Sequence, residues 1–361
     1  MARKKVYKIK HYKTGYRRRK NNAFLKVFLL VVGCSVVFVL SYLLLGPLTD
    51  LIYDKTITSS DSSEPAPETE TSSTTQTPEE TVSLELMKTR VITIDELQNK
   101  ANHSSLVSTI KSEGYMAVVI PVRTKDNIYF STQNELALRT ASVVDVGLNE
   151  LIKSFKSEKI NVIGEFSVFM DDKLPRVIYG SDKLPMAVRY KNNPKFLAID
   201  YITDAKDEGG ITWLSPESKE TREYITDLAK SAAATGVDGI IFTNYNYVVH
   251  SGAVFTDAAG FNKVETLKAF SSELKETLKG INIMFMGTTA ELKDGNINKF
   301  GGKLSDIADD IIITADKCDD ELINLISQNK EKTFSLRLKE CNEETLEKLK
   351  IQENVKIVLV G

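Results

Sequence analysis

The chain has 361 residues, 42% of them hydrophobic and 27% charged, which is enough for one large folded domain with additional segments. Its 47 basic and 49 acidic residues give a net charge of −2, but eleven of the basic residues and none of the acids lie within positions 1–26. Such a basic head can bind nucleic acid or anionic lipid, and the apolar segment that follows it argues for lipid and against nucleic acid.

That segment, Val27–Leu45, contains nineteen residues without a charge and is almost wholly apolar. This length can cross a hydrocarbon core of roughly 30 Å, and no clear cleavage site for a signal peptide follows it. The excess of positive charge before it places the basic tail in the cytoplasm. We therefore predict a signal anchor at 27–46 that crosses the lipid bilayer once and leaves the C-terminal part of the chain extracellular.

The segment after the anchor, 47–83, is predicted to be a linker. From Thr56 to Ser83 it consists mainly of Ser, Thr, Glu and Pro and has no Lys, Arg or aromatic residue. Such a composition cannot bury enough apolar surface to offset the entropy lost on ordering. The linker would hold a folded domain, 84–361, away from the membrane.

Within 84–361, short apolar runs alternate with amphipathic stretches, which is typical of repeated strand–helix units. The strands are expected at 116–122, 161–169, 196–199, 239–242, 281–286, 310–313, 333–338 and 355–360. The helices are expected at 144–157, 264–278, 304–308, 321–327 and 343–350, with a further helix before residue 236. Eight strands over about 280 residues predict a (β/α)8 TIM-like barrel. An open doubly wound sheet is the alternative, but it usually carries a Gly-rich phosphate turn, which the sequence lacks.

The stretch 213–248 is the clearest of these units. Ser215 is a plausible N-cap with Pro216 at the first helical position, and Gly236 stands where a helix often ends in a left-handed residue. The run Gly239–Phe242 then predicts a buried strand. Polar residues follow the strand directly, at the end where barrels carry their chemistry. We therefore predict that Thr243, Asn244 and Asn246 belong to a ligand site, together with Tyr245, Tyr247 and Arg123.

Four segments of the chain carry a resemblance to a known family. In order they read MAVVIPVRTKDNIYFST, NVIGEFSVFMDD, WLSPESKETREYI and VDGIIFTNYNYV. They resemble a bacterial family of glycoside-hydrolase-like (β/α)8 barrels that is largely uncharacterised and distantly related to α-amylase-like enzymes. The resemblance covers most of 106–313 and implies the same barrel fold.

The resemblance also implies a degenerate set of catalytic positions. Where the family places acids after its strands, this chain has Pro121, Thr243 and Met284, and Asn246 replaces a basic residue. Glycoside hydrolysis needs two carboxyl groups, one protonated and one ionised. A barrel that keeps the scaffold but lacks these acids is what we expect of a binding protein descended from an enzyme.

Three acids remain as catalytic candidates. Asp171 matches the family motif, although it could equally cap a loop. Glu165 lies an even number of positions before Asp171, so that both side chains could face the barrel mouth. Glu165 could instead pair with Arg123 across adjacent strands, and Asp200 reads more as a turn residue. Trp213, the only tryptophan, is more often a packing residue than a sugar platform, while for Tyr245 and Tyr247 stacking and packing are equally open.

The remaining chemistries have little support in the sequence. The three histidines are scattered without the spacing of metal ligands, and no cofactor motif or G-x-S-x-G nucleophile motif occurs. We predict neither a metal nor a cofactor. Cys318 and Cys341 both follow late strands, so they could form a disulfide, although two free thiols are at least as consistent with the pattern.

Three functions follow from these observations. The preferred one is a membrane-anchored, extracytoplasmic barrel that has lost catalysis and binds a glycan or another component of the cell envelope. The second is an active glycosidase that uses Asp171 with Glu165 or Asp200. The third is a scaffold for protein interactions in the envelope.

Overall fold

The computed structural model describes residues 85–200, 210–249, 253–254 and 261–361. The chain divides into two units, 1–77 and 78–361, and every described residue belongs to the second. The predicted tail, anchor and linker at 1–83 therefore lie outside the described residues. Among the helices of the described part, none has the length and apolar character needed to cross a membrane.

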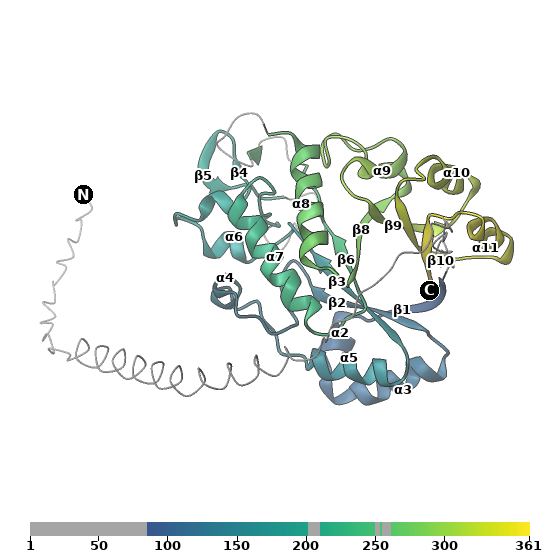
Figure 1. Ribbon diagram of the computed structural model, residues 1–361. Helices are drawn as coiled ribbons and strands as arrows, with labels where there is room; N and C mark the ends of the chain where they lie inside the picture. The colour runs from purple at the N-terminus through teal and green to yellow at the C-terminus, as the bar shows by residue number, and fades with distance from the viewer. Residues whose placement is uncertain (1–84, 201–209, 250–252, 255–260) are drawn as a thin grey trace, which may run out of the picture. The chain divides into compact units, whose positions relative to one another are not determined.

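A closed barrel of eight parallel strands forms the centre of the second unit, in the order β1-β11-β10-β9-β8-β6-β3-β2 (Figure 1). The strands are β1 Glu85–Val91, β2 Ala117–Arg123, β3 Asn161–Ser167, β6 Gly239–Thr243, β8 Asn282–Thr288, β9 Asp310–Lys317, β10 Thr333–Glu340 and β11 Val355–Val360. Closure leaves no strand with an unpaired edge. The predicted barrel is confirmed.

Two assignments within the barrel were wrong. The first strand, β1, was not predicted, because it mixes polar and apolar residues: Leu86 and Val91 are exposed while Met87 and Thr89 are buried. The predicted strand at 196–199 does not belong to the barrel. Its residues overlap β5 (Asn193–Leu197), which forms a separate antiparallel sheet with β4 (Arg189–Tyr190) and β7 (Ala253–Val254).

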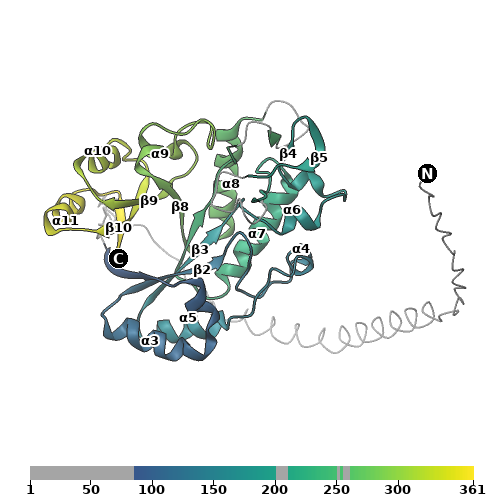
Figure 2. The ribbon, with the colours of Figure 1, turned by 180° about the vertical axis from the view of Figure 1, so that it is seen from behind.

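Helices cover the outside of the barrel (Figures 1 and 2). They are α2 Ile94–Gln98, α3 His103–Ser112, α4 Glu135–Arg139, α5 Leu148–Ser157, α6 Leu174–Val177, α7 Lys219–Ala233, α8 Lys263–Thr277, α9 Thr289–Lys293, α10 Asp320–Gln328 and α11 Glu343–Lys350, with 3-10 turns at Lys100–Asn102, Leu184–Met186 and Leu304–Asp306. In α5 the buried residues Leu148, Leu151, Ile152 and Phe155 recur at spacings of three and four, so that one face of the helix packs against the sheet.

The helix before β6 begins later than predicted. Its N-cap is Ser218, whose hydroxyl accepts a hydrogen bond from the backbone N–H of Thr221, and not Ser215. Ser215 is fully buried. Gly236 after the helix has a φ of +93°, which confirms the predicted left-handed residue there.

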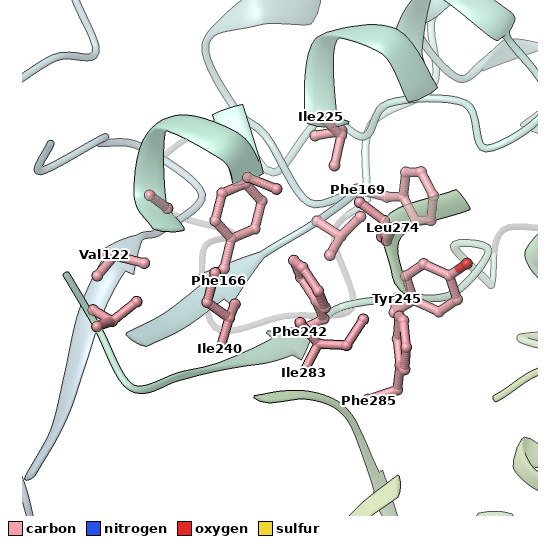
Figure 3. Packing of buried hydrophobic residues seen from close by; sticks show 14 of the residues in the cluster. Val122, Phe166, Phe169, Ile225, Ile240, Phe242, Tyr245, Leu274, Ile283 and Phe285 are labelled. Atoms are coloured by element: carbon pink, nitrogen blue, oxygen red, sulfur yellow. The ribbon is translucent and has the colours of Figure 1, made fainter. Parts of the chain in front are cut away.

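Two separate layers of apolar side chains hold the barrel together. The inner layer fills the barrel and includes Val119, Ile163, Ile241, Met284 and Ile312, so the interior is a packed core and not a channel. The outer layer lies between strands and helices. There the rings of Phe166, Phe242 and Phe285 occupy one row across β3, β6 and β8, with centroids 5.6 and 5.4 Å apart (Figure 3).

Candidate functional site

A cleft of about 600 Å³ opens at the carboxyl ends of the barrel strands. It is lined by side chains of β1, β3, β8, β9 and β10, among them Val91, Glu165, Met286, Thr314 and Arg337. This is the end of the barrel where enzymes of this architecture carry their active sites. The cleft is therefore the candidate functional site.

An ion pair crosses the barrel at the base of this cleft. The guanidinium Nη1 of Arg337 lies 3.0 Å from Oε2 of Glu165, and their side chains keep 20% and 33% of their surface exposed. In the closed strand order β10 and β3 stand four places apart in either direction, so the pair joins opposite sides of the barrel. Because Glu165 follows the inward-facing Ile163 by two positions, it stands directly above the inner apolar layer.

The structure corrects the predicted pairing of Glu165 with Arg123. A shift in the strand register between Pro121 and Arg123 aligns Arg123 with Phe166, whose ring points outward. Arg123 is consequently buried behind the sheet, 2% exposed, with its guanidinium 5.3 Å from the centre of the Phe166 ring and 5.9 Å from that of Tyr224. It does not reach the cleft, where it was expected to bind ligand.

Asp171 is buried and fully engaged. Its Oδ2 accepts a hydrogen bond of 2.6 Å from Arg123, and its Oδ1 accepts bonds of 2.9 and 2.7 Å from the backbone N–H groups of Lys173 and Leu174. β3 ends at Ser167, so the alternation that predicted Asp171 at the mouth does not extend to it. The carboxylate holds the loop before α6.

Asp200 lies apart from the cleft. It is 6% exposed, and its Oδ2 accepts a hydrogen bond of 3.2 Å from the indole N–H of Trp213. Trp213 is itself 5% exposed, so its role is packing rather than a platform for sugars. Neither residue adds a second carboxyl group or an aromatic surface to the mouth.

The polar segment after β6 is brought next to β3. Thr243 pairs in register with Ser167, and the Asn244 amide donates a hydrogen bond of 3.1 Å to the Ser167 hydroxyl. The side-chain amide of Asn246 turns back to the carbonyl of Tyr247, at 2.8 Å. The three residues are half-buried, and none of them lines the cleft.

The tyrosines of this segment do not stand in a ligand site. Tyr245 is 2% exposed, donates a hydrogen bond from its hydroxyl to the Leu267 carbonyl, and lies 4.6 Å from the ring of Phe285. Tyr247 is fully buried with the ammonium of Lys263 4.9 Å from its ring centre. Burial raises the pKa of both phenols. Their predicted stacking on a sugar ring is corrected, because a buried ring has no free face.

Of the two alternatives left open for Cys318 and Cys341, the structure has the free thiols and not the disulfide. Burial raises the pKa of Cys318 to about 12, which keeps this thiol protonated and unreactive at neutral pH. Within the described residues no cluster of three His, Cys, Asp or Glu side chains has the arrangement of a metal site.

Three charged residues near the strand ends were missed. In β10 the side chains of Ser335 and Arg337 are on the inward face, opposite to the buried Phe334, Leu336 and Leu338. A charged residue on the inward face near a strand end is a signal for a residue of the mouth.

Asp316, at the rim of the cleft, lies 2.6 Å from Lys339, and this hydrogen bond lowers its pKa. Glu217, just before α7, has its pKa raised by burial, against the opposing influence of Tyr247, Lys263 and Arg222.

The cleft combines an ion pair that crosses the barrel with a second acid at its rim. The Glu165–Arg337 pair offers both acceptors and donors to the hydroxyl groups of a sugar. The other acid of the cleft, Asp316, is exposed, and the hydrogen bond from Lys339 lowers its pKa. Neither Asp171 nor Asp200 reaches the cleft. Glu217, whose pKa is raised by burial, does not line this cleft.

Comparisons with solved structures find distant similarities. A hypothetical protein from Ruminiclostridium thermocellum is 19% identical, with 54% of this chain and 95% of that chain covered and a TM-score of 0.45. A cycloisomaltooligosaccharide glucanotransferase from Paenibacillus sp. is 13% identical, with 72% and 38% covered and a TM-score of 0.48. A GH20 exo β-N-acetylglucosaminidase from Vibrio harveyi is 9% identical, with 71% and 41% covered and a TM-score of 0.48. The chain spans less than half the length of the last two proteins.

No curated protein matches the sequence. One family model, described as "Putative glycosyl hydrolase domain", matches residues 91–312, which begin at the last residue of β1 and end within β9. The matched region is more than half of the chain and contains Glu165. The chain therefore belongs to this family of glycosyl-hydrolase-like domains.

Proposed function

We propose that this protein is a membrane-anchored, extracytoplasmic barrel that binds a glycan or another cell-envelope component at its mouth and does not hydrolyse it. The observation that carries the proposal is the Glu165–Arg337 ion pair across the mouth, combined with the burial of Asp171 and Asp200 in structural hydrogen bonds. The family supplies the class of ligand.

The loss of catalysis follows from the requirements of the reaction. A glycosidase needs one carboxyl group that is protonated and one that is ionised on opposite sides of the bond. Pro121, Thr243 and Met284 occupy positions where the resembling family places acids, and none of them can transfer a proton. General acid–base catalysis contributes roughly 10²–10⁴-fold per group, so a barrel with a single suitable acid would retain little measurable rate.

An active glycosidase is the second candidate, because Glu165 and Asp316 line the same cleft. Two carboxyl groups on one cleft are the minimum that the reaction needs. Against it stands the pairing of each acid with a cation, Arg337 and Lys339. The hydrogen bond from Lys339 lowers the pKa of Asp316, which disfavours Asp316 as the protonated group.

The first prediction is that the soluble fragment 78–361 binds glycans without cleaving them. This fragment contains every barrel strand and both apolar layers. Incubation with a panel of oligosaccharides should release no new reducing ends, while retention on immobilised glycans should be measurable. Glu165→Gln and Arg337→Ala should each weaken retention by about tenfold, a loss equal to roughly 1.4 kcal/mol.

Lys279→Ala is the matched control, since Lys279 forms an exposed ion pair with Glu276 before the start of β8, at the end of this strand opposite to the cleft. It should leave retention unchanged. Turnover of any glycan that Glu165→Gln abolishes would establish the glycosidase. A fragment that neither binds nor cleaves any member of the panel would favour the protein scaffold.

The second prediction concerns the anchor at 27–46, which is proposed from the apolar run and the basic residues before it. Protease added to intact cells or protoplasts should remove 84–361 and leave a fragment that contains the N-terminal tail. Antibodies against each end would follow the two products, and a cytoplasmic protein that stays intact serves as the control. A C-terminal domain that survives while an extracellular marker is digested contradicts the proposed orientation.

A further inference from the structure

A second cleft, of about 710 Å³, lies on the segment between β3 and α7. It is formed by α6 and the residues after it and by the hairpin of β4 and β5, which lie together in both views of the molecule (Figures 1 and 2). It shares no lining residue with the cleft at the barrel mouth. Its volume is within the range of sites that bind small ligands.

The walls of this second cleft are mainly apolar and include an exposed aromatic pair. Tyr179 and Phe196 keep 47% and 49% of their surface exposed, with ring centroids 6.4 Å apart and an interplanar angle of 36°. Tyr190, Leu197 and Ile199 complete the apolar lining. Two large rings left exposed in the same hollow indicate a binding surface, because scattered single residues are the usual form of apolar exposure.

The polar groups of the cleft are few, and one of them is fixed in place. Arg176 donates from Nε and Nη2 to the Asp172 carboxylate and from Nη2 to the Gly210 carbonyl, at 2.8 to 3.1 Å. Its Nη1 makes no hydrogen bond to any described residue. Asn192 and Asn193 add side-chain amides from the hairpin turn. The Asp172 carboxylate balances the charge of Arg176, so the lining offers hydrogen bonds without a net charge.

This combination matches one class of ligand. Aromatic rings pack against the apolar face of a pyranose, and amides exchange hydrogen bonds with its polar edge. An N-acetylated hexosamine differs from a hexose of an unmodified glucan by an acetamido group in place of one hydroxyl group. An N-acetylated sugar fits better, because it presents a methyl group to the apolar wall and an amide to the asparagines.

We infer that the cleft formed by Tyr179, Phe196, Arg176, Asn192 and Asn193 is a second glycan-binding site, specific for oligosaccharides of N-acetylated hexosamines. The inference rests on the proposed glycan-binding function and extends it to a separate surface. The two sites together would hold one long chain or two neighbouring chains. A single chain that occupied both sites would bind more tightly than a chain bound at either site alone.

The test is the binding of chitohexaose to fragment 78–361 by calorimetry, with cellohexaose as the ligand that lacks the acetamido groups. Tyr179→Ala and Phe196→Ala should each weaken chitohexaose binding by about tenfold. Phe261→Ala is the matched control, since Phe261 is an aromatic residue with 45% exposure outside this cleft, and it should bind like the unaltered fragment. The three positions are exposed, so the substitutions should leave the fold intact, and a thermal unfolding curve for each variant checks this.

The outcomes separate this site from the barrel mouth. Loss of binding in the Tyr179 and Phe196 variants supports the second site, whether or not Glu165→Gln also weakens binding. Loss only in Glu165→Gln and Arg337→Ala overturns it and leaves the proposed function of the mouth intact. Equal binding of cellohexaose overturns the specificity for N-acetylated sugars, and no binding of chitohexaose to the unaltered fragment overturns the site itself.

Discussion

Replacing Asp171 by alanine should lower the free energy of unfolding by about 3–5 kcal/mol, because removal of one partner leaves a buried charge without compensation. The remaining guanidinium, that of Arg123, has a side chain only 1% exposed. The substitution also leaves the backbone N–H groups of Lys173 and Leu174 without their acceptor. The loop after β3 would lose the contact that fixes its direction.

Urea unfolding of fragment 78–361, followed by circular dichroism, measures this effect. Glu276→Ala is the control, since the pair of Glu276 with Lys279 is exposed at 71% and 72%, and pairs of this kind contribute little to stability. Asp171→Asn should lie between the control and Asp171→Ala, because an amide oxygen can still accept hydrogen bonds but carries no charge. A change below about 1 kcal/mol for Asp171→Ala would contradict a structural role and return Asp171 to the list of catalytic candidates.

The barrel could be predicted from the sequence because buried parallel strands give continuous apolar runs. Ile240 to Phe242 and Ile311 to Ile313 are buried on both faces, against the inner and the outer apolar layers. β1 lacks such a run, because Leu86 on its outer face is 39% exposed. Phe196 in β5 is an apolar residue at the surface. Its apolar character led to the prediction of a barrel strand where the chain forms a hairpin.

The candidate site was predictable only as far as the strands extend. Glu165 lies within β3, and its predicted position at the mouth agrees with the cleft. Its partner Arg337 lies 172 positions later, so the pair depends on how the barrel closes. Asn244, directly after β6, has a φ of +52°, and this left-handed residue breaks the alternation of side chains. The positions of the tyrosines that follow it could not be read from strand parity.

Replacing Tyr245 by alanine should lower the free energy of unfolding by about 3–5 kcal/mol, the range for removal of a large buried aromatic ring. The ring packs between those of Phe169, Phe270 and Phe285, with centroids 5.6, 5.9 and 4.6 Å away. Tyr245→Phe keeps this packing and loses only the hydrogen bond to the Leu267 carbonyl. Its effect should be about 1 kcal/mol.

The comparison with Tyr179→Ala distinguishes a core residue from a ligand residue. Tyr179 is 47% exposed, so its removal should change stability by less than about 0.5 kcal/mol while it weakens chitohexaose binding. Tyr245→Phe should show the reverse, a measurable loss of stability with glycan binding unchanged. Urea unfolding and calorimetry on the same samples give both quantities. Weaker glycan binding by a fully folded Tyr245→Phe protein would mean that the segment after β6 contacts the ligand.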